Sequence, residues 1–371
     1  MKNSHTLLII EEAFQKTQEF NYKRYISELG IKYQNISNKS SSGQKHKVNQ
    51  ILEKIGLHLM YKSVVDELEN NLYNKMGKWS SVGTILLALK NPEKFDEAYN
   101  ILSDEESKST FDWFIKYRVA YAFLGEIAGE IYPSQISKEE YLRKMNQLKF
   151  DRYRSLIMIG GYYLNSGIEE TADSWIFEQY RIKGKLEVTQ DDYVIDGGAF
   201  LGETSFWFIS KGAGKVFAFE PDQFNFGILS DNIKRNKMKD KIIPIQEVLS
   251  DRNGDVEFLS TGTGSSKTVF KGNESVRSIK LDSFVEEKNL ESVDFIKLDV
   301  EGAEMDILKG AVETIKRFKP KMAISVYHKP EDIITIPKFI LETLPDAKFY
   351  LSHKYYSWCD TILFVNPRDN I

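Results

Sequence analysis

The glycine-rich turn at residues 197–202 constrains this chain most. A short apolar run, Tyr193 to Ile195, ends in Asp196, and Gly202 opens a helical pattern directly after the turn. A strand, a tight turn and a helix N-terminus in that order form the usual binding turn for a nucleotide-like ligand at the carboxyl end of a strand. The stretch therefore predicts the first βα unit of a nucleoside-binding α/β domain.

Asp196 and Ala199 favour one class of ligand over another. In the dinucleotide-binding turn G-x-G-x-x-G, the middle glycine lets the backbone approach a pyrophosphate. Ala199 occupies that position here, and the carboxylate of Asp196 would repel a pyrophosphate. The same carboxylate suits a ligand that carries an ammonium group and no phosphate. S-adenosylmethionine is such a ligand, so the turn favours it over NAD.

Two further strand ends carry acids. The apolar run Val216 to Phe219 ends in Glu220, about 24 residues after Asp196, where a ribose-binding carboxylate falls in these folds. The next apolar run leads to Glu247, and in sheets of this order the following loop flanks the adenine. We therefore expect Glu220 at the ribose and Glu247 or its neighbours at the exocyclic amine.

The stretch from Asp294 to Glu304 places Lys297, Asp299 and Glu301 at another strand end. Clustered ionisable groups at such an edge favour a catalytic site, whereas the simpler interpretation is an ion pair of Lys297 and carboxylates that serve the helix dipole. His328 ends the following strand and is a candidate general base. An alternative is a divalent cation bound by Asp299, Glu301 and His328, although we expect no metal ligands.

Composition bounds the class of protein. The 371 residues allow two domains, and 42% hydrophobic with 28% charged residues is typical of globular proteins. A net charge of -4 gives no whole-chain attraction to nucleic acid or anionic membranes, and we expect no nucleic acid partner and no integral membrane segment. The single Cys359 excludes an internal disulfide and a Cys-rich metal site. No apolar run is long enough for a signal peptide or a spanning helix, and we expect a cytoplasmic protein.

The first half of the chain reads as all-α. Helical spacing of apolar residues covers 1–34 and about 47–75, with a polar loop at 34–43 between them. Two capping boxes, Ser103 to Glu106 and Ser137 to Glu140, each predict a helix with serine as its N-cap. No convincing strand pattern precedes about residue 185. These helices offer a surface through which homo-oligomers can form.

From residue 193 strands alternate with helices, which predicts a largely parallel sheet. We place strands at 193–196, 215–219, 242–246, 294–299, 321–326, 347–352 and 361–365. We place helices near 202–211, 223–236, 303–317 and 333–343. The stretch 251–282, with the flexible Gly262 to Lys267, reads as a loop inserted near the site, where it is a candidate to close over the acceptor.

Three segments follow from this order: a helical domain at 1–150, an aromatic-rich connecting segment at 151–190, and an α/β domain at 191–371. The connecting segment carries Tyr162, Tyr163, Trp175 and Phe177 to Tyr180. Their structural interpretation is inter-domain packing. Their functional interpretation places a tyrosine or Glu178 over the amino-acid end of the cofactor.

Several stretches together resemble the FkbM family of methyltransferases. They are Val194 to Thr204, Phe219 to Asn225, Ile279 to Asp282, Ile296 to Glu304 and Tyr327 to Asp332. The resemblance covers about 185–330 well, the remainder loosely, and the N-terminal helices not at all. It implies a class I Rossmann-like fold with a seven-stranded, mostly parallel sheet. It also implies S-adenosylmethionine as cofactor, and often a hydroxyl of a sugar or polyketide as acceptor.

The resemblance implies roles by matching position. Asp196, Gly198 and Thr204 would lie about the methionine portion, Glu220 at the ribose, Asp222 or Asn225 near the adenosine, and Asp299 at the reactive centre. The same stretches supply the other predicted cofactor contacts: Gly197, Ala199, Glu203, Pro221, Glu247 and Val248.

The leading hypothesis is O-methylation of a sugar, glycan or secondary-metabolite hydroxyl. His328 or a carboxylate of Asp299 or Glu301 would remove the proton, with Lys297 as a further catalytic candidate. N-methylation of an amine or protein side chain is the alternative among enzymes. A nucleoside-binding scaffold without turnover is the alternative outside them.

Overall fold

The computed structural model describes residues 4–33, 76–151, 156–260, 267–268, 272 and 274–367. The chain forms two compact units, one of Met1–Asp96 with Asp112–Pro133 and one of Glu97–Phe111 with Ser134–Ile371. The predicted loop at 34–43 and helix at 47–75 lie outside the described residues. No helix within the described ranges is both long and apolar enough to cross a membrane.

The N-terminal elements are helices, as the sequence predicts. They are α1 (His5–Tyr33), α3 (Met76–Lys90), α4 (Pro92–Ile101), α5 (Glu105–Leu124), η1 (Gly125–Ile127), α6 (Ala128–Ile131) and α7 (Lys138–Met145). Within the first unit, the buried Arg118 of α5 donates to Ser80 Oγ of α3 at 2.7 Å. A buried guanidinium needs such partners, so this contact fixes the two helices against each other.

The two predicted capping boxes differ in outcome. Ser137 caps α7 as predicted, because its Oγ accepts the N–H of Glu140 at 3.1 Å. The prediction for α5 is wrong by one residue: the carboxylate of Asp104, not Ser103, accepts the N–H of Ser107 at 2.8 Å. Aspartate satisfies the free N–H groups of a helix start as well as serine does, so the pattern alone does not choose between them.

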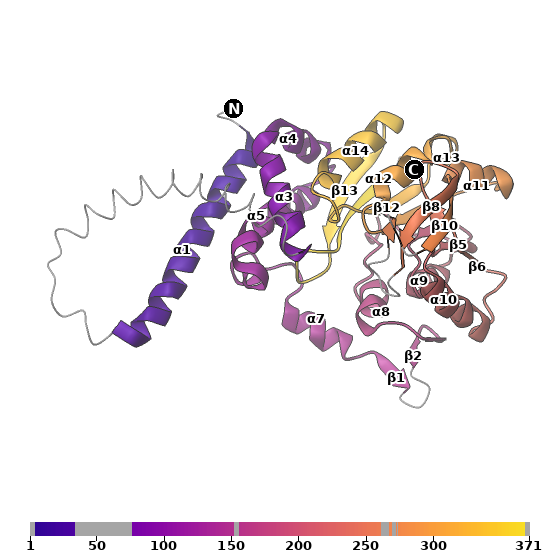
Figure 1. Ribbon diagram of the computed structural model, residues 1–371, viewed down its shortest axis with the longest axis horizontal. Coiled ribbons are helices and arrows are strands. Elements are labelled where there is room, and N and C mark those ends of the chain that lie inside the picture. Colours follow the sequence, from indigo (N-terminus) through magenta and orange to yellow (C-terminus); the bar gives the residue numbers. More distant parts are fainter. Residues whose placement is uncertain are drawn as a thin grey trace. The chain divides into compact units, whose positions relative to one another are not determined.

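A seven-stranded sheet organises the second unit (Figure 1). Its strands are β4 (Tyr193–Gly197), β5 (Lys215–Phe219), β6 (Ile242–Ile245), β11 (Phe295–Leu298), β12 (Lys321–Ser325), β13 (Lys348–His353) and β14 (Thr361–Asn366). Their spatial order is β13-β14-β12-β11-β4-β5-β6, and only β14 runs antiparallel to its neighbours. Each strand lies within one residue of its predicted bounds, so the mostly parallel sheet is confirmed.

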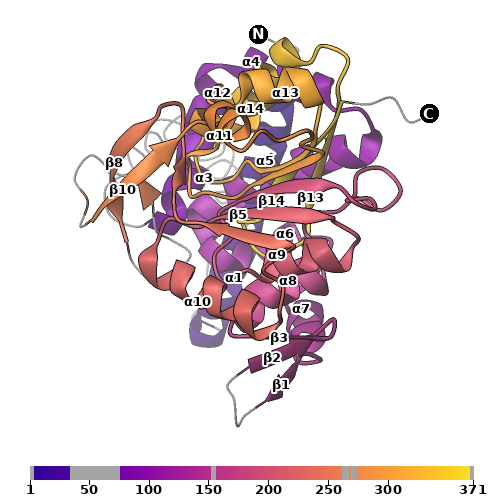
Figure 2. The same ribbon diagram turned by 90° about the vertical axis from the view of Figure 1, so that its right-hand side faces the viewer.

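Helices cover both faces of this sheet (Figure 2). One face carries α8 (Ile168–Trp175), α9 (Glu203–Ser210) and α10 (Gln223–Arg235), and the other carries α11 (Leu281–Glu287), α12 (Glu304–Lys309), α13 (Val312–Phe318) and α14 (Asp332–Thr343). Phe208 of α9 packs on Phe295 of β11, with ring centroids 5.3 Å apart. On the other face Phe284 of α11 packs on Phe219 of β5 at 4.9 Å. Burial on both faces explains why these strands are largely apolar.

Two smaller sheets correct the sequence prediction. β1 (Lys149–Asp151), β2 (Leu156–Ile159) and β3 (Tyr162–Leu164) form an antiparallel sheet where no strand was expected, because each is too short to show a readable alternation. β7 (Val248–Leu249), β8 (Gly254–Leu259), β9 (Lys267–Thr268) and β10 (Glu274–Ile279) form a four-stranded sheet within the predicted loop. Residues 261–266 of that loop lie outside the described residues, so its closing role stays a prediction.

The edge strand β13 has backbone groups covered by the segment around the start of α5. Ser103 Oγ accepts the N–H of Phe349 at 2.9 Å, and Ser107 Oγ accepts that of Leu351 at 3.0 Å. Uncovered edge groups would offer a pairing site to another strand. Residues Glu97–Phe111 therefore belong with the sheet, although they lie within the predicted helical domain.

Candidate active site

A cavity of about 290 Å³ lies at the carboxyl edge of the seven-stranded sheet. The chain order reverses between β4 and β11, with β5 and β6 on one side and β12 on the other. Such a reversal leaves a crevice outside the strand ends in which ligands bind. The predicted residues that line it are Gly197, Gly198, Glu203, Thr204, Glu220, Pro221, Asn225, Glu247, Val248, Lys297, Asp299 and Glu301. Four predicted residues do not line it: Asp196, Ala199, Asp222 and His328.

Lys297 ties the glycine turn to the neighbouring strand. Its Nζ forms an ion pair with Asp196 Oδ1 at 3.2 Å and donates to the carbonyl oxygens of Gly197 and Gly198 at 3.1 and 2.6 Å. One carboxylate and two carbonyl oxygens thus surround an ammonium whose side chain is 2% exposed. The geometry therefore favours an ion pair that shapes the turn over the catalytic role predicted for Lys297.

Asp196 points into the protein rather than into the cavity. Its Oδ2 accepts the hydroxyl protons of Thr204 and Ser205 at 2.7 and 2.6 Å, while Oδ1 faces Lys297. A carboxylate enclosed in this way does not reach the ammonium of a ligand, which contradicts the contact predicted from the sequence. Asp196 instead joins the end of β4 to the N-terminus of α9.

Gly198 is required by a close approach of the backbone. Its φ is +76°, and a Cβ there would lie 1.9 Å from the carbonyl oxygen of Asp299. The N–H groups of Gly198 and Ala199 both donate to the carbonyl of Phe219, at 3.1 and 2.9 Å. These donors are therefore directed at β5 and not at a ligand phosphate. Ala199 is fully buried and does not line the cavity, which corrects its predicted cofactor contact.

Glu220 presents its carboxylate to the cavity beside the turn. Oε2 accepts the N–H of Phe200 at 3.0 Å, and Oε1 accepts that of Asp222 at 2.9 Å. The side chain of Asn225 also hydrogen-bonds this carboxylate. A carboxylate has about four acceptor sites, so it can still accept a ribose hydroxyl. Burial raises the pKa of Glu220 to about 8. The residue type, position and free acceptor capacity fit the predicted cofactor.

Asp222 caps a helix instead of contacting the cavity. Its Oδ1 accepts the N–H groups of Phe224 and Asn225 at 2.9 and 3.1 Å, and Oδ2 accepts the hydroxyl of Ser260 at 2.7 Å. The predicted choice between Asp222 and Asn225 therefore falls on Asn225, which lines the cavity. Asp222 positions it by fixing the first turn of α10.

Glu203 and Glu247 line the cavity at different places. Glu203, in the first turn of α9, is buried and accepts the hydroxyl of Ser166 at 3.1 Å, and burial raises its pKa to about 8. Glu247 precedes β7 and pairs with Arg277 at 3.1 Å. That ion pair competes with the predicted contact of Glu247 to an exocyclic amine, which stays a prediction.

Two tyrosines hold Asp299 at the centre of the cavity edge. Tyr180 donates to Oδ2 at 2.6 Å and Tyr327 donates to Oδ1 at 3.2 Å. Burial by itself would raise the pKa of Asp299, but the positive charges of His328 and Lys297 outweigh it and lower the pKa below the usual value. Asp299 is therefore an anion at neutral pH, suited to face a positive charge rather than to take up a proton.

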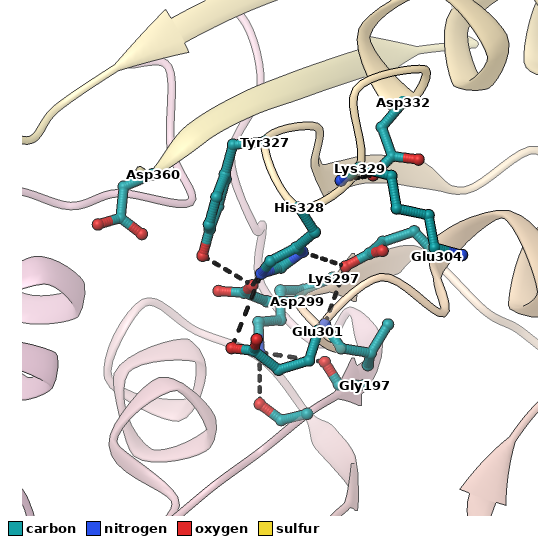
Figure 3. Close-up of polar contacts among 12 residues, drawn as sticks. Gly197, Lys297, Asp299, Glu301, Glu304, Tyr327, His328, Lys329, Asp332 and Asp360 are labelled. Atoms are coloured by element: carbon teal, nitrogen blue, oxygen red, sulfur yellow. Dashed lines mark hydrogen bonds and ion pairs between the residues drawn. The ribbon is translucent and has the colours of Figure 1, made fainter. Parts of the chain in front are cut away.

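His328 lies among three carboxylates (Figure 3). Its Nδ1 donates to Glu304 Oε1 at 2.7 Å, and its Nε2 lies 3.5 Å from Asp299 Oδ1 and 3.8 Å from Glu301 Oε1. Burial lowers the pKa of His328, but the carboxylates outweigh it and raise the pKa to about 10. An imidazolium has no lone pair with which to accept a proton, so the predicted general-base role of His328 does not fit.

The same cluster bears on the metal alternative. Asp299, Glu304 and His328 place possible ligand atoms within 4.8 Å of one another. The sequence interpretation names Glu301 as the third ligand instead of Glu304. The imidazolium supplies the positive charge that these carboxylates need. We therefore derive no step through a metal.

Sequence reasoning missed two acids on the far side of the cavity. Asp173 of α8 accepts the hydroxyl of Tyr141 at 2.8 Å, and Asp360 accepts Gln179 Nε2–H at 2.9 Å. Burial raises the pKa of Asp360 to about 6, and the charge of Asp299 adds to it. Asp360 directly precedes β14, which is antiparallel to β12, so its position lies at the edge where the parallel strands end. The antiparallel direction of β14 was the signal from which the position of Asp360 at this edge could have been predicted.

The aromatic segment packs within the second unit, and the place predicted for one of its tyrosines over the cofactor stays a prediction. Tyr162 packs on Trp175 and on Phe206, with ring centroids 6.1 and 5.0 Å apart, whereas Tyr180 reaches Asp299. Glu178 forms an ion pair with Arg181 at 2.9 Å and does not line the cavity, so its predicted place over the cofactor is wrong.

The sheet order, the cavity at the order reversal and the acid after the second strand define a class I Rossmann-like methyltransferase fold. Residues 196–355 match the family model described as the Methyltransferase FkbM domain. Residues 196–355 therefore form an S-adenosylmethionine-dependent methyltransferase domain that matches the FkbM family, as the sequence resemblance implies.

Named relatives differ in how much of each chain is matched. Hexuronic acid methyltransferase AglP of Haloferax volcanii is 26% identical over 224 residues, which are 57% of this chain and 90% of that protein. The 2-O-methyltransferase NoeI of Sinorhizobium fredii is 29% identical over 149 residues, 34% of this chain and 60% of that protein. The crystal structure of methyltransferase FkbM from Methylobacillus flagellatus aligns with a TM-score of 0.51 at 21% identity, covering 75% of this chain and 59% of that one. This chain thus spans about three fifths of the last two proteins, and the solved structure supports the fold.

Proposed function

We propose that the protein transfers a methyl group from S-adenosylmethionine to a hydroxyl of a sugar or glycan. The observation that carries the proposal is the position of Asp299 at the end of β11. On one side of it lie the proposed cofactor residues that follow β5, and on the other side lies the carboxylate of Asp360, which precedes β14. The names of two relatives, which refer to a hexuronic acid and to 2-O-methyl transfer, support a sugar hydroxyl as acceptor.

The cofactor supplies the methyl group on a positively charged sulfur. Glu220 binds the ribose hydroxyls, and the anionic Asp299, fixed by Tyr180 and Tyr327, faces the positive centre. Holding donor and acceptor in line accounts for most of the acceleration expected of such a site.

We assign the general base to Asp360. Its carboxylate borders the cavity and is oriented by Gln179, and its pKa of about 6 leaves it ionised at neutral pH while still basic enough to receive a proton. The acceptor hydroxyl would transfer its proton to the Asp360 carboxylate while its oxygen bonds to the methyl carbon. The carbon–sulfur bond would break in the same step, with S-adenosylhomocysteine as the leaving group. Asp299, whose pKa is lowered, is a weaker base for this step.

Transfer of radiolabelled methyl groups to a panel of sugar glycosides and simple amines tests the proposal. Asp360→Asn should lower kcat at least tenfold while the affinity for S-adenosylhomocysteine stays unchanged, and Asp346→Asn, an exposed site away from the cavity, serves as control. Full turnover by Asp360→Asn would remove the base assignment. Labelling of amines with no labelled sugar would replace O-methylation by N-methylation.

A further inference from the structure

The charges at the acceptor end of the cavity restrict which sugars it accepts. We propose that the acceptor carries no negative group beside the reacting hydroxyl, so that amine-bearing and uncharged sugars are taken in preference to uronic acids. This inference rests on the proposed function and narrows its substrate class.

The topology separates the two ends of the cavity. Glu220 follows β5 and Glu247 follows β6, and both strands lie on the same side of β4. The proposed cofactor contacts are therefore on this side. The other end is built from α8, the segment after it and the connection between β13 and β14. Its lining residues are Glu169, Glu170, Asp173, Gln179, Tyr355 and Asp360. With the cofactor on the first side, this end is left for the acceptor.

The described lining of the cavity is strongly one-sided in its ionisable residue types. It contains nine carboxyl side chains and a single basic one, Lys297. The ammonium of Lys297 is already engaged by Asp196 and two carbonyl oxygens. Burial, and next the negative charge of Asp360, raise the pKa of Asp173 well above its usual value. The surroundings of Asp173 thus already disfavour its own negative charge.

Basic residues near this end are used elsewhere. Arg181 pairs with Glu178 at 2.9 Å and with Glu187 at 2.6 Å. Lys354 donates to the carbonyl oxygens of Glu178 and Arg181 at 2.8 and 2.6 Å. Neither residue lines the cavity. Among the described residues that line this end, a carboxylate on the acceptor would therefore meet acids and no basic side chain, and juxtaposed like charges repel each other.

The same lining suits hydroxyl and ammonium groups. An ionised carboxylate only accepts hydrogen bonds, and hydroxyl and ammonium groups both donate them. Glu169 and Glu170 are exposed where α8 borders the cavity, so an entering acceptor meets them first. One relative, 26% identical, is named as a hexuronic acid methyltransferase. Its name would suggest an acidic sugar as acceptor, whereas the acidic end of this cavity favours an acceptor without a carboxylate.

Three sugars that differ at one carbon test the inference on the full chain. Methyl glycosides of 6-amino-6-deoxyglucose, glucose and glucuronic acid share every ring hydroxyl and carry an ammonium, a hydroxyl or a carboxylate at carbon 6. The galactose and mannose series repeat the comparison for other ring configurations. Transfer of radiolabelled methyl from S-adenosylmethionine gives kcat/KM for each. We expect the ammonium and hydroxyl members to exceed the carboxylate member at least tenfold.

A variant pair assigns the effect to the cavity. Glu169→Gln with Glu170→Gln should narrow the gap between the uncharged and the carboxylate member, whereas Glu313→Gln, 78% exposed on α13, should leave it unchanged. A carboxylate member that is methylated as fast as its uncharged counterpart overturns the inference and leaves the proposed function intact. If every series stays unlabelled although S-adenosylhomocysteine binds, the sugar-hydroxyl function itself is wrong, and the inference falls with it.

Discussion

Replacing Lys297 with methionine should destabilise the sheet-containing unit severely. The substitution keeps the apolar stem but removes the charge opposite Asp196, a carboxylate with 0% exposure. Only the hydroxyls of Thr204 and Ser205 would then compensate it. Breaking a buried ion pair by removing one partner costs about 3–5 kcal/mol. This is roughly a hundredfold or greater fall in the folded-to-unfolded ratio, since about 1.4 kcal/mol corresponds to a factor of ten.

Urea unfolding followed by tryptophan fluorescence measures the loss, and Lys321→Met is the matched control. Lys321 also lies in a strand of this sheet, where its Nζ binds Asp192 and the carbonyl of Glu187, both at 2.8 Å, but its side chain is 13% exposed and distant in the fold from the glycine turn. We expect a smaller loss there and unchanged affinity for S-adenosylhomocysteine. Lys297→Met should also weaken that affinity, because the carbonyls of Gly197 and Gly198 lose their donor.

A double substitution isolates the electrostatic part. Adding Asp196→Asn to Lys297→Met removes the uncompensated charge, so the double variant should be more stable than Lys297→Met alone. A loss below about 1 kcal/mol for Lys297→Met, the range of an exposed pair, would refute the buried-pair reasoning. Strictly additive losses in the double variant would refute it equally.

Three further outcomes follow from the site. Binding of S-adenosylhomocysteine at pH 7 should release a proton, because burial raises the pKa of Glu220 to about 8 and ribose hydroxyls require its ionised form. Calorimetry in buffers of different ionisation enthalpy detects this proton. Glu220→Gln should abolish the proton release and most of the affinity. His328 has a folded pKa of about 10 against 6.5 unfolded, so its stabilising contribution is complete below pH 6.5 and is lost as the pH rises toward 10. His328→Gln should accordingly flatten the fall of unfolding free energy over that range, and a slope like that of the wild type would show that the imidazole is neutral. Tyr180→Phe removes a 2.6 Å hydrogen bond to charged Asp299 and should lower kcat/KM by roughly 10- to 150-fold, the equivalent of about 1.5–3 kcal/mol; unchanged turnover would remove Asp299 from the reactive centre.

Local patterns explain why much of the fold is readable from the sequence. Strands such as Lys215–Phe219 and Phe295–Leu298 are buried on both faces and appear as largely apolar runs between turns, interrupted in the second by Lys297. The acid after β5, Glu220, follows from the same reading because the strand end fixes its location. The short strands β1 to β3 have no comparable signal, since a three- or four-residue strand shows no period.

Side-chain direction is where the sequence interpretation failed. Asp196, Ala199, Asp222 and His328 all occupy the predicted turns and strand ends, yet none lines the cavity. Which way a polar side chain points depends on partners distant in sequence: Lys297 lies about 100 residues from Asp196, and such pairings leave no local pattern.

The sequence by itself determined the α/β class, the positions of the strands of the seven-stranded sheet along the chain and the residues that follow them. Hydrophobic period and turn chemistry, on which these depend, are properties of neighbouring residues. Only the tertiary structure decided that Lys297 shapes the turn, that three carboxylates keep His328 charged, and that Asp173 and Asp360 complete the cavity. Burial and long-range charge set the protonation of these groups, and both exist only once α8, β11 and β14 meet at one edge of the sheet.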